Sequence, residues 1–177
     1  MARFWKWLLS ASACIGVLLI AGFLLIKSRQ ETAQLNDTVR RQAPGKFVKL
    51  EKGTVHYALY GSDTAKLLVL IHGGGTSGME VWQHNIPYLL SKGYRVLAYD
   101  LYGRGYSDRP VATYDLDLYR QQLSRLLDTL RLQEPFDLVA MSMGEHIKID
   151  YAANHPERVK HIMLLAAAAS ADLPDSK

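Results

Sequence analysis

Short apolar runs alternate with segments of helical periodicity, and this alternation restricts the fold more than any other feature. The runs are too uniformly apolar for strands with one wet face, and they read KLLVLIH, RVLAYD, FDLVAM and HIMLLAAAA. Such runs are typical of strands covered on both faces of a sheet. The intervening segments, at 79–94, 113–130 and 145–155, place apolar residues on one helical face, with Thr113 as a helix cap. The sequence therefore predicts an α/β fold, in which helices flank a mostly parallel sheet.

The segment before the first apolar run has a different period. FVKLEKG and TVHYALYG alternate apolar with polar residues and meet near Lys52-Gly53. Alternation of this kind on both sides of a turn indicates an antiparallel hairpin with one buried face. We therefore expect two hairpin strands ahead of the parallel ones.

The amino-terminal part reads as a membrane anchor. Between Lys6 and Lys27 lie twenty uncharged, mostly apolar residues, enough for about 30 Å of helix. A cleaved signal peptide is the alternative, but its apolar region is about 7 to 15 residues long and ends at a small-residue site. The predicted organisation is a basic segment 1–6, a transmembrane signal-anchor helix 7–26, a polar stalk 27–46 and a domain 47–177. The flanking charges place the domain of this single-pass protein on the non-cytoplasmic side of the membrane.

Charge and cysteine content exclude several classes of partner. Residues 1–46 carry a net charge of +5 and residues 47–177 a net charge of −1. The predicted domain therefore lacks the basic surface of a nucleic-acid-binding protein. Cys14 is the single cysteine, which excludes an intrachain disulfide and a cysteine-based metal site.

A serine stands where the third apolar run meets a helical segment. In Ala140-Met141-Ser142-Met143-Gly144, small residues two positions before and after Ser142 allow the sharp turn of a nucleophile elbow. The Met143 amide, at the start of the helix, would then point toward an oxygen attacked by Ser142. The alternative is that Ser142 only caps the helix.

A glycine loop follows the first apolar run. His72-Gly73-Gly74-Gly75 can bring backbone amides close to a substrate oxygen, and the Gly74 amide is our candidate for the second oxyanion donor. We expect His72 to be a structural hydrogen-bonding residue that points back toward its strand.

The same loop has a rival interpretation as a nucleotide site. Gly73-x-Gly75-x-x-Gly78 matches the dinucleotide fingerprint, and Asp100 ends the next apolar run, where a ribose-binding acid belongs. Thr76-Ser77-Gly78 prolongs the loop instead of continuing a helix, and the preceding hairpin is foreign to that fold. A nucleotide site would also leave unexplained why Ser142 stands at a tight turn between a strand and a helix.

Four motifs in order, LVLIHGGG, YDLYGRGYSDRP, VAMSMG and AANHPERV, resemble the α/β-hydrolase fold superfamily, especially its serine esterase and lipase-like branch. The resemblance covers about residues 47–169. It implies Ser142 as the nucleophile, the amides of Gly74 and Met143 as the oxyanion hole, no cofactor or metal, and a small-molecule or lipid ester as substrate. Asp100, Gly103, Gly105 and Ser107 would shape a loop beside the pocket.

The chain departs from the family pattern in two ways. Glu145 stands where the family has a small residue, and no histidine follows His161 to act as general base. Asp172 lies where some relatives carry the catalytic acid, but a solvated tail residue is the alternative. We expect an amino-terminal part of a hydrolase that lacks the last strands and is inactive or incomplete as a 177-residue chain. The second hypothesis is a non-catalytic fragment or pseudoenzyme, which self-associates through the exposed edge at 161–169.

Overall fold

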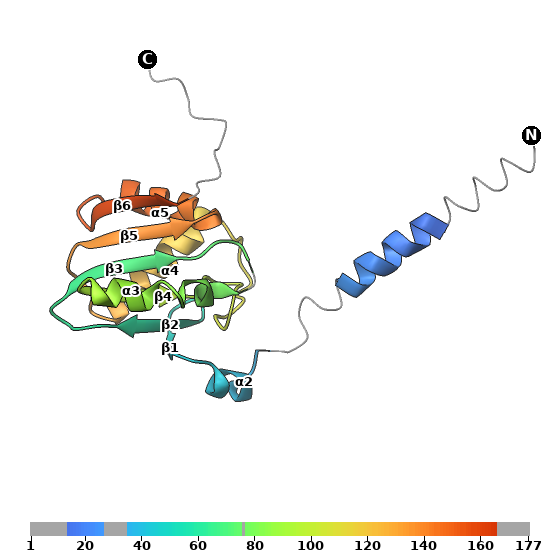
Figure 1. Ribbon diagram of the computed structural model, residues 1–177, viewed down its shortest axis with the longest axis horizontal. Helices are drawn as coiled ribbons and strands as arrows, with labels where there is room; N and C mark the ends of the chain where they lie inside the picture. The colour runs from blue at the N-terminus through green and yellow to red at the C-terminus, as the bar shows by residue number, and fades with distance from the viewer. Residues whose placement is uncertain (1–13, 27–34, 76, 166–177) are drawn as a thin grey trace, which may run out of the picture. The chain divides into compact units, whose positions relative to one another are not determined.

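The computed structural model describes residues 14–26, 35–75 and 77–165, which Figure 1 shows in colour. Two compact units are distinguished along the chain, Met1–Asp37 and Thr38–Lys177. The sheet and the candidate site belong to the second unit. The short helix α2, Asp37–Gln42, precedes the first strand.

A six-stranded sheet forms the centre of the described domain, in the order β1-β2-β4-β3-β5-β6. β1 pairs antiparallel with β2, and β2 pairs antiparallel with β4. The remaining pairs, β4 with β3, β3 with β5 and β5 with β6, are parallel. The prediction of a hairpin followed by a mostly parallel sheet is therefore confirmed. The strands are β1 Lys46–Lys49, β2 Thr54–Tyr60, β3 Lys66–Ile71, β4 Tyr94–Tyr99, β5 Phe136–Met141 and β6 Val159–Leu165.

Helices cover both faces of this sheet (Figure 1). α4, Leu116–Thr129, and α5, Met143–Asn154, lie on one face, and α3, Ile86–Ser91, lies on the other. Two clusters of buried side chains correspond to the two faces. The larger contains residues of α4 and α5, while the smaller contains Met79 and Trp82 of the 3-10 helix η1, Gly78–Trp82, and Ile86 of α3. Side chains alternate between the two clusters along β5, because successive strand residues point to opposite faces.

Two helices differ from the sequence-based expectation. The segment 79–94, predicted as one helix, is divided into η1 and α3, and Pro87 lies in the first turn of α3. Proline lacks an N–H and fits the first turn of a helix better than its interior, so the helix restarts there. The cap of α4 is Asp115 instead of Thr113, because the Asp115 carboxylate accepts a hydrogen bond from the Leu118 N–H at 2.9 Å.

The predicted transmembrane helix over 7–26 is wrong. Residues 7–13 lie outside the described part of the chain, and residues 14–26 form a helix. Within the described ranges, no helix is long and apolar enough to cross a membrane. The single-pass localisation inferred from this helix is overturned with it.

Candidate active site

Ser142 occupies a strained corner between β5 and α5. Its backbone has φ 52° and ψ −123°, a left-handed conformation that residues with a Cβ rarely adopt. The side chain is exposed and makes no hydrogen bond to the first turn of α5. Helix capping therefore does not explain this serine, since a cap would accept a hydrogen bond from that turn.

Two glycines, one after the turn and one in the loop after β3, allow close packing around Ser142. A Cβ on Gly144 would lie 2.7 Å from the His72 carbonyl oxygen and 3.0 Å from that of Ile71, so α5 packs directly on the end of β3. A Cβ on Gly73 would lie 3.0 Å from Ser142 Cβ and 3.5 Å from its Oγ. The glycine loop and the serine corner are therefore in contact.

The two predicted oxyanion residues lie next to each other. A Cβ on Gly74 would be 3.5 Å from Met143 Sδ and 3.8 Å from Met143 Cβ. Gly74 follows β3 and Met143 follows β5, and these strands are parallel neighbours. Their carboxyl ends therefore bring Gly74 and Met143 to the same edge of the sheet, and their role as oxyanion donors stays a prediction.

His72 orients the peptide that carries the Gly74 amide. Its Nε2 accepts a hydrogen bond from the Leu101 N–H at 3.0 Å, so the proton of the neutral ring resides on Nδ1, which donates to the Gly73 carbonyl at 2.6 Å. Burial lowers the pKa of His72 and favours this neutral form. In a trans peptide the Gly73 carbonyl and the Gly74 N–H point in opposite directions. Both ring nitrogens are thus engaged, which agrees with the expected structural role and excludes His72 as the general base.

Asp100 organises the loop after β4 from a buried position. Its carboxylate accepts hydrogen bonds from the N–H groups of Met79 at 2.6 Å and Tyr106 at 2.8 Å, and it contacts His56 Nδ1 at 2.8 Å. Only 1% of Asp100 is exposed. The carboxylate is therefore not free to bind a ribose. Asp100 cannot be the ribose-binding acid that the dinucleotide interpretation requires.

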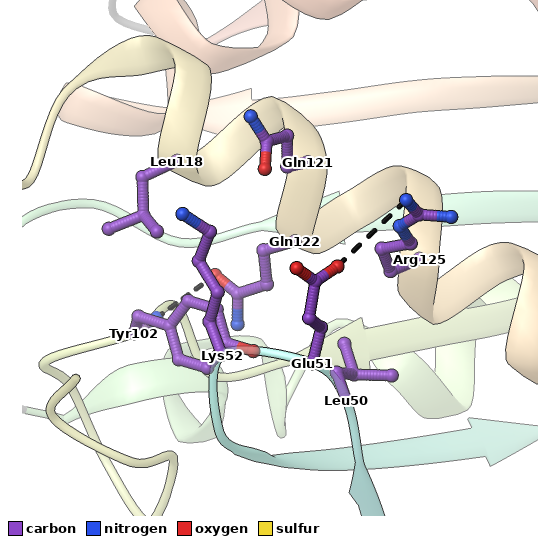
Figure 2. A pocket seen from close by; sticks show the side chains of 8 residues that line it. All are labelled: Leu50, Glu51, Lys52, Tyr102, Leu118, Gln121, Gln122 and Arg125. Atoms are coloured by element: carbon purple, nitrogen blue, oxygen red, sulfur yellow. Dashed lines mark hydrogen bonds and ion pairs between the residues drawn. The ribbon is translucent and has the colours of Figure 1, made fainter. Parts of the chain in front are cut away.

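Gln122 of α4 fixes the beginning of the same loop. Its Oε1 accepts a hydrogen bond from the Tyr102 N–H at 3.0 Å, which Figure 2 shows. Its Nε2 donates to the Asp100 carbonyl at 2.9 Å. The hollow beside it, between α4 and the β1–β2 turn, has a volume of about 10 Å³. This space is about the size of one water molecule, so it is no substrate pocket.

Glu145 is turned toward the sheet and is neutralised there. It is 2% exposed and lies 2.5 Å from the ammonium group of Lys148, which also donates to the Met163 carbonyl at 2.6 Å. Glu145, which departs from the family pattern next to the serine turn, thus takes part in the contact between α5 and β6. Lys148 was missed, although its position three residues after Glu145 is the spacing of neighbours on a helix.

The remaining catalytic partners are not assembled in the described part of the chain. Asp172, the candidate acid, lies outside the described residues. Within the described ranges, no histidine is hydrogen-bonded to Ser142 Oγ. Sequence reasoning also missed Arg104, whose Nε donates to the Gly74 carbonyl at 2.8 Å. No spacing rule connects these two residues, which are brought together by the sheet order.

Comparisons with known proteins agree with this geometry. Residues 66–176 match the model of the alpha/beta hydrolase fold family. A 2-hydroxy-6-oxononadienedioate/2-hydroxy-6-oxononatrienedioate hydrolase of Paraburkholderia phymatum is 34% identical over 139 residues, which cover 74% of this chain and 48% of that protein. The chain thus spans about half the length of this curated relative.

Two solved structures share the fold. Cfl2 of Burkholderia cenocepacia is similar with a TM-score of 0.66 and 30% identity, covering 74% of this chain and 45% of that one. A structure from a study of carboxylesterases of Nitrososphaera gargenis has a TM-score of 0.62 and 29% identity, covering 66% of this chain and 43% of that one.

Proposed function

The chain belongs to the α/β-hydrolase fold family, and from this membership we propose that it is a serine hydrolase acting on carboxylic esters, with Ser142 as the nucleophile. One observation carries the proposal: Ser142 is held exposed, in a strained conformation, against the glycine loop. Backbone strain is typical of functional positions when the residue is not a glycine and its side chain makes no capping hydrogen bond.

The reaction would proceed through an acyl-enzyme. Ser142 Oγ attacks the ester carbonyl carbon, and its proton leaves to a base. The negative charge that develops on the carbonyl oxygen is stabilised by the amides of Gly74 and Met143. The tetrahedral intermediate expels the alcohol, and water then attacks the acyl group and releases the acid. The family chemistry requires no cofactor for these steps.

The base is the missing element of this mechanism. A serine hydroxyl without a histidine partner is a weak nucleophile, and serine hydrolases that lose this partner lose several orders of magnitude in rate. We therefore expect slow turnover by the 177-residue chain. Asp172 remains a prediction for the acid. A pseudoenzyme is the second candidate function, and it is favoured by the same absence of a histidine bond to Ser142 within the described ranges.

The names of the relatives suggest which features of a substrate to test first. The Paraburkholderia phymatum relative is named for a substrate that is a dioate, which carries two carboxylates. The structure from Nitrososphaera gargenis is described among carboxylesterases. We therefore propose a small-molecule acyl substrate, and a panel should include neutral esters and esters that carry a carboxylate.

A fluorophosphonate probe tests the proposal directly, because it reacts covalently with a nucleophilic serine at a rate that reports how far the serine is activated. Covalent labelling of the purified chain should be slow, because no histidine is hydrogen-bonded to Ser142 within the described ranges, and it should disappear in Ser142→Ala. Ser91→Ala is the matched control, since Ser91 is an exposed serine at the end of α3, and it should label like the unsubstituted chain. Absence of labelling in the unsubstituted protein would contradict the hydrolase and support the pseudoenzyme.

A further inference from the structure

Arg104 lies against the loop that would hold the oxyanion. Its Nε donates to the Gly74 carbonyl at 2.8 Å, and its Nη1 donates to the Gly103 carbonyl at 2.9 Å. Arg104 follows β4, Gly74 follows β3 and Ser142 follows β5, and these strands are neighbours in the order β4-β3-β5. The guanidinium group is therefore at the same edge of the sheet as the candidate nucleophile.

The charge of Arg104 has no carboxylate partner in the part of the chain that the structure describes. Among the described residues, no ion pair involves Arg104, whereas other partly buried arginines have acidic partners, as Arg40 has Asp108, Arg95 has Asp63 and Arg120 has Asp150. A guanidinium has five N–H donors, and the two hydrogen bonds to carbonyl oxygens leave three of them. The side chain is only partly buried, so these donors can be reached by a ligand.

The segment that carries Arg104 is held in place on both sides. Gln122 binds the backbone of Asp100 and Tyr102, and the Asp100 carboxylate accepts the Tyr106 N–H. The Ser107 hydroxyl donates to the Asp100 carbonyl at 2.7 Å. A cationic group on such a fixed loop needs little reordering to bind an anion, which favours binding.

We propose that Arg104 is the specificity-determining residue of the hydrolase site and binds a carboxylate of the substrate while the ester carbonyl approaches Ser142. This inference rests on the proposed function for the role of Ser142. A planar guanidinium with adjacent free donors matches the two oxygens of a carboxylate. The substrate class is then an acyl compound with a carboxylate remote from the scissile bond. Neutral esters lack this contact.

Binding to the Ser142→Ala chain tests this assignment without turnover. The probes are monomethyl hexanedioate, which has one ester and one carboxylate, and dimethyl hexanedioate, which has two esters and no charge. Calorimetry or ligand-detected NMR should show tighter binding of the monoester. Arg104→Gln should weaken the monoester by about tenfold or more and leave the diester unchanged. Arg125→Gln, which removes an exposed arginine of α4, should change neither affinity.

The salt dependence of binding and the Arg104→Lys variant test the same assignment. Added sodium chloride should reduce the preference for the monoester in the Ser142→Ala chain, because an exposed ion pair is screened by salt. Arg104→Lys should keep part of the preference, because it keeps the charge but not the paired donors. Equal affinities of the two probes, or an equal loss for both in Arg104→Gln, would overturn the assignment. These measurements do not depend on Ser142 reactivity, whereas failed fluorophosphonate labelling overturns only the hydrolase.

Discussion

Gly73 lies so close to Ser142 that a methyl group on Gly73 would be 3.0 Å from Ser142 Cβ. These residues follow β3 and β5, which are paired in parallel from Leu68 and Asp137 to Ile71 and Ala140. The register of two strands thus sets the distance between the glycine loop and the candidate nucleophile. The first prediction follows from this contact.

Gly73→Ala should slow fluorophosphonate labelling of Ser142 by about tenfold or more, because the added methyl displaces Ser142 or the loop, and small misplacements at a reacting centre are costly. Gly75→Ala is the matched control. A Cβ on Gly75 meets nothing within 4 Å, so labelling and melting temperature should stay close to those of the unsubstituted chain. Equal labelling rates in the two variants would show that the contact does not position the serine.

Ser142→Gly should be more stable than Ser142→Ala by about 1 kcal/mol. Both variants lose the hydroxyl, but only glycine adopts the positive φ of this position without steric strain. Chemical denaturation of the two proteins measures the difference. If the alanine variant is the more stable one, the corner is not strained.

Lys148→Met should lower the free energy of unfolding by about 3 kcal/mol, because it leaves the buried Glu145 carboxylate without its cationic partner. Glu145→Leu combined with Lys148→Met should restore much of this loss, since no charge then remains buried. Arg125→Met is the control. It breaks an exposed pair with Glu51 and should cost less than about 1 kcal/mol. If the double variant is as unstable as Lys148→Met, the loss of stability does not come from burying the Glu145 carboxylate without Lys148.

Stability should decrease as pH falls below about 6.5 through the titration of His72. Burial lowers the pKa of His72 in the folded protein below its value in the unfolded chain. At a pH between these two pKa values, His72 is protonated in the unfolded chain and neutral in the folded protein, so a fall in pH favours unfolding. The slope from this residue is at most about 1.4 kcal/mol per pH unit. His72→Gln should lose this component, whereas His146→Gln, at an exposed position of α5, should retain it. Denaturation midpoints at several pH values provide the test.

Self-association should be reduced by Met163→Lys. β6 is the last strand of the described sheet, and Ile162 and Met163 on it are 46% and 59% exposed. Exposed apolar edge strands pair with other chains, and a lysine there opposes pairing. Light scattering over a range of concentrations should show a smaller mean mass for this variant. An unchanged mass distribution would show that the chain does not self-associate through the β6 edge.

Local sequence signals were sufficient for most of the fold. Continuous apolar runs identified the parallel strands, and alternation identified the hairpin. These signals succeed because the periods of strands and helices are imposed by the backbone itself. The single helix predicted over 79–94 failed because Pro87, inside the apolar pattern, starts a new helix. The transmembrane helix was a wrong prediction, since no helix in the part of the chain that the structure describes is long and apolar enough to cross a membrane.

In the candidate site too, some residues could be predicted from the sequence and others could not. Ser142, Gly74 and Met143 follow from motifs, because a tight turn requires small residues at fixed spacings from the serine. The pairing of Glu145 with Lys148 and the contact of Arg104 with Gly74 do not follow from motifs. The sequence by itself determined which segments are strands, and which serine stands on a corner. Only the tertiary structure decided which charges are neutralised and which one faces the loop, because strand order brings together side chains that are far apart in the chain.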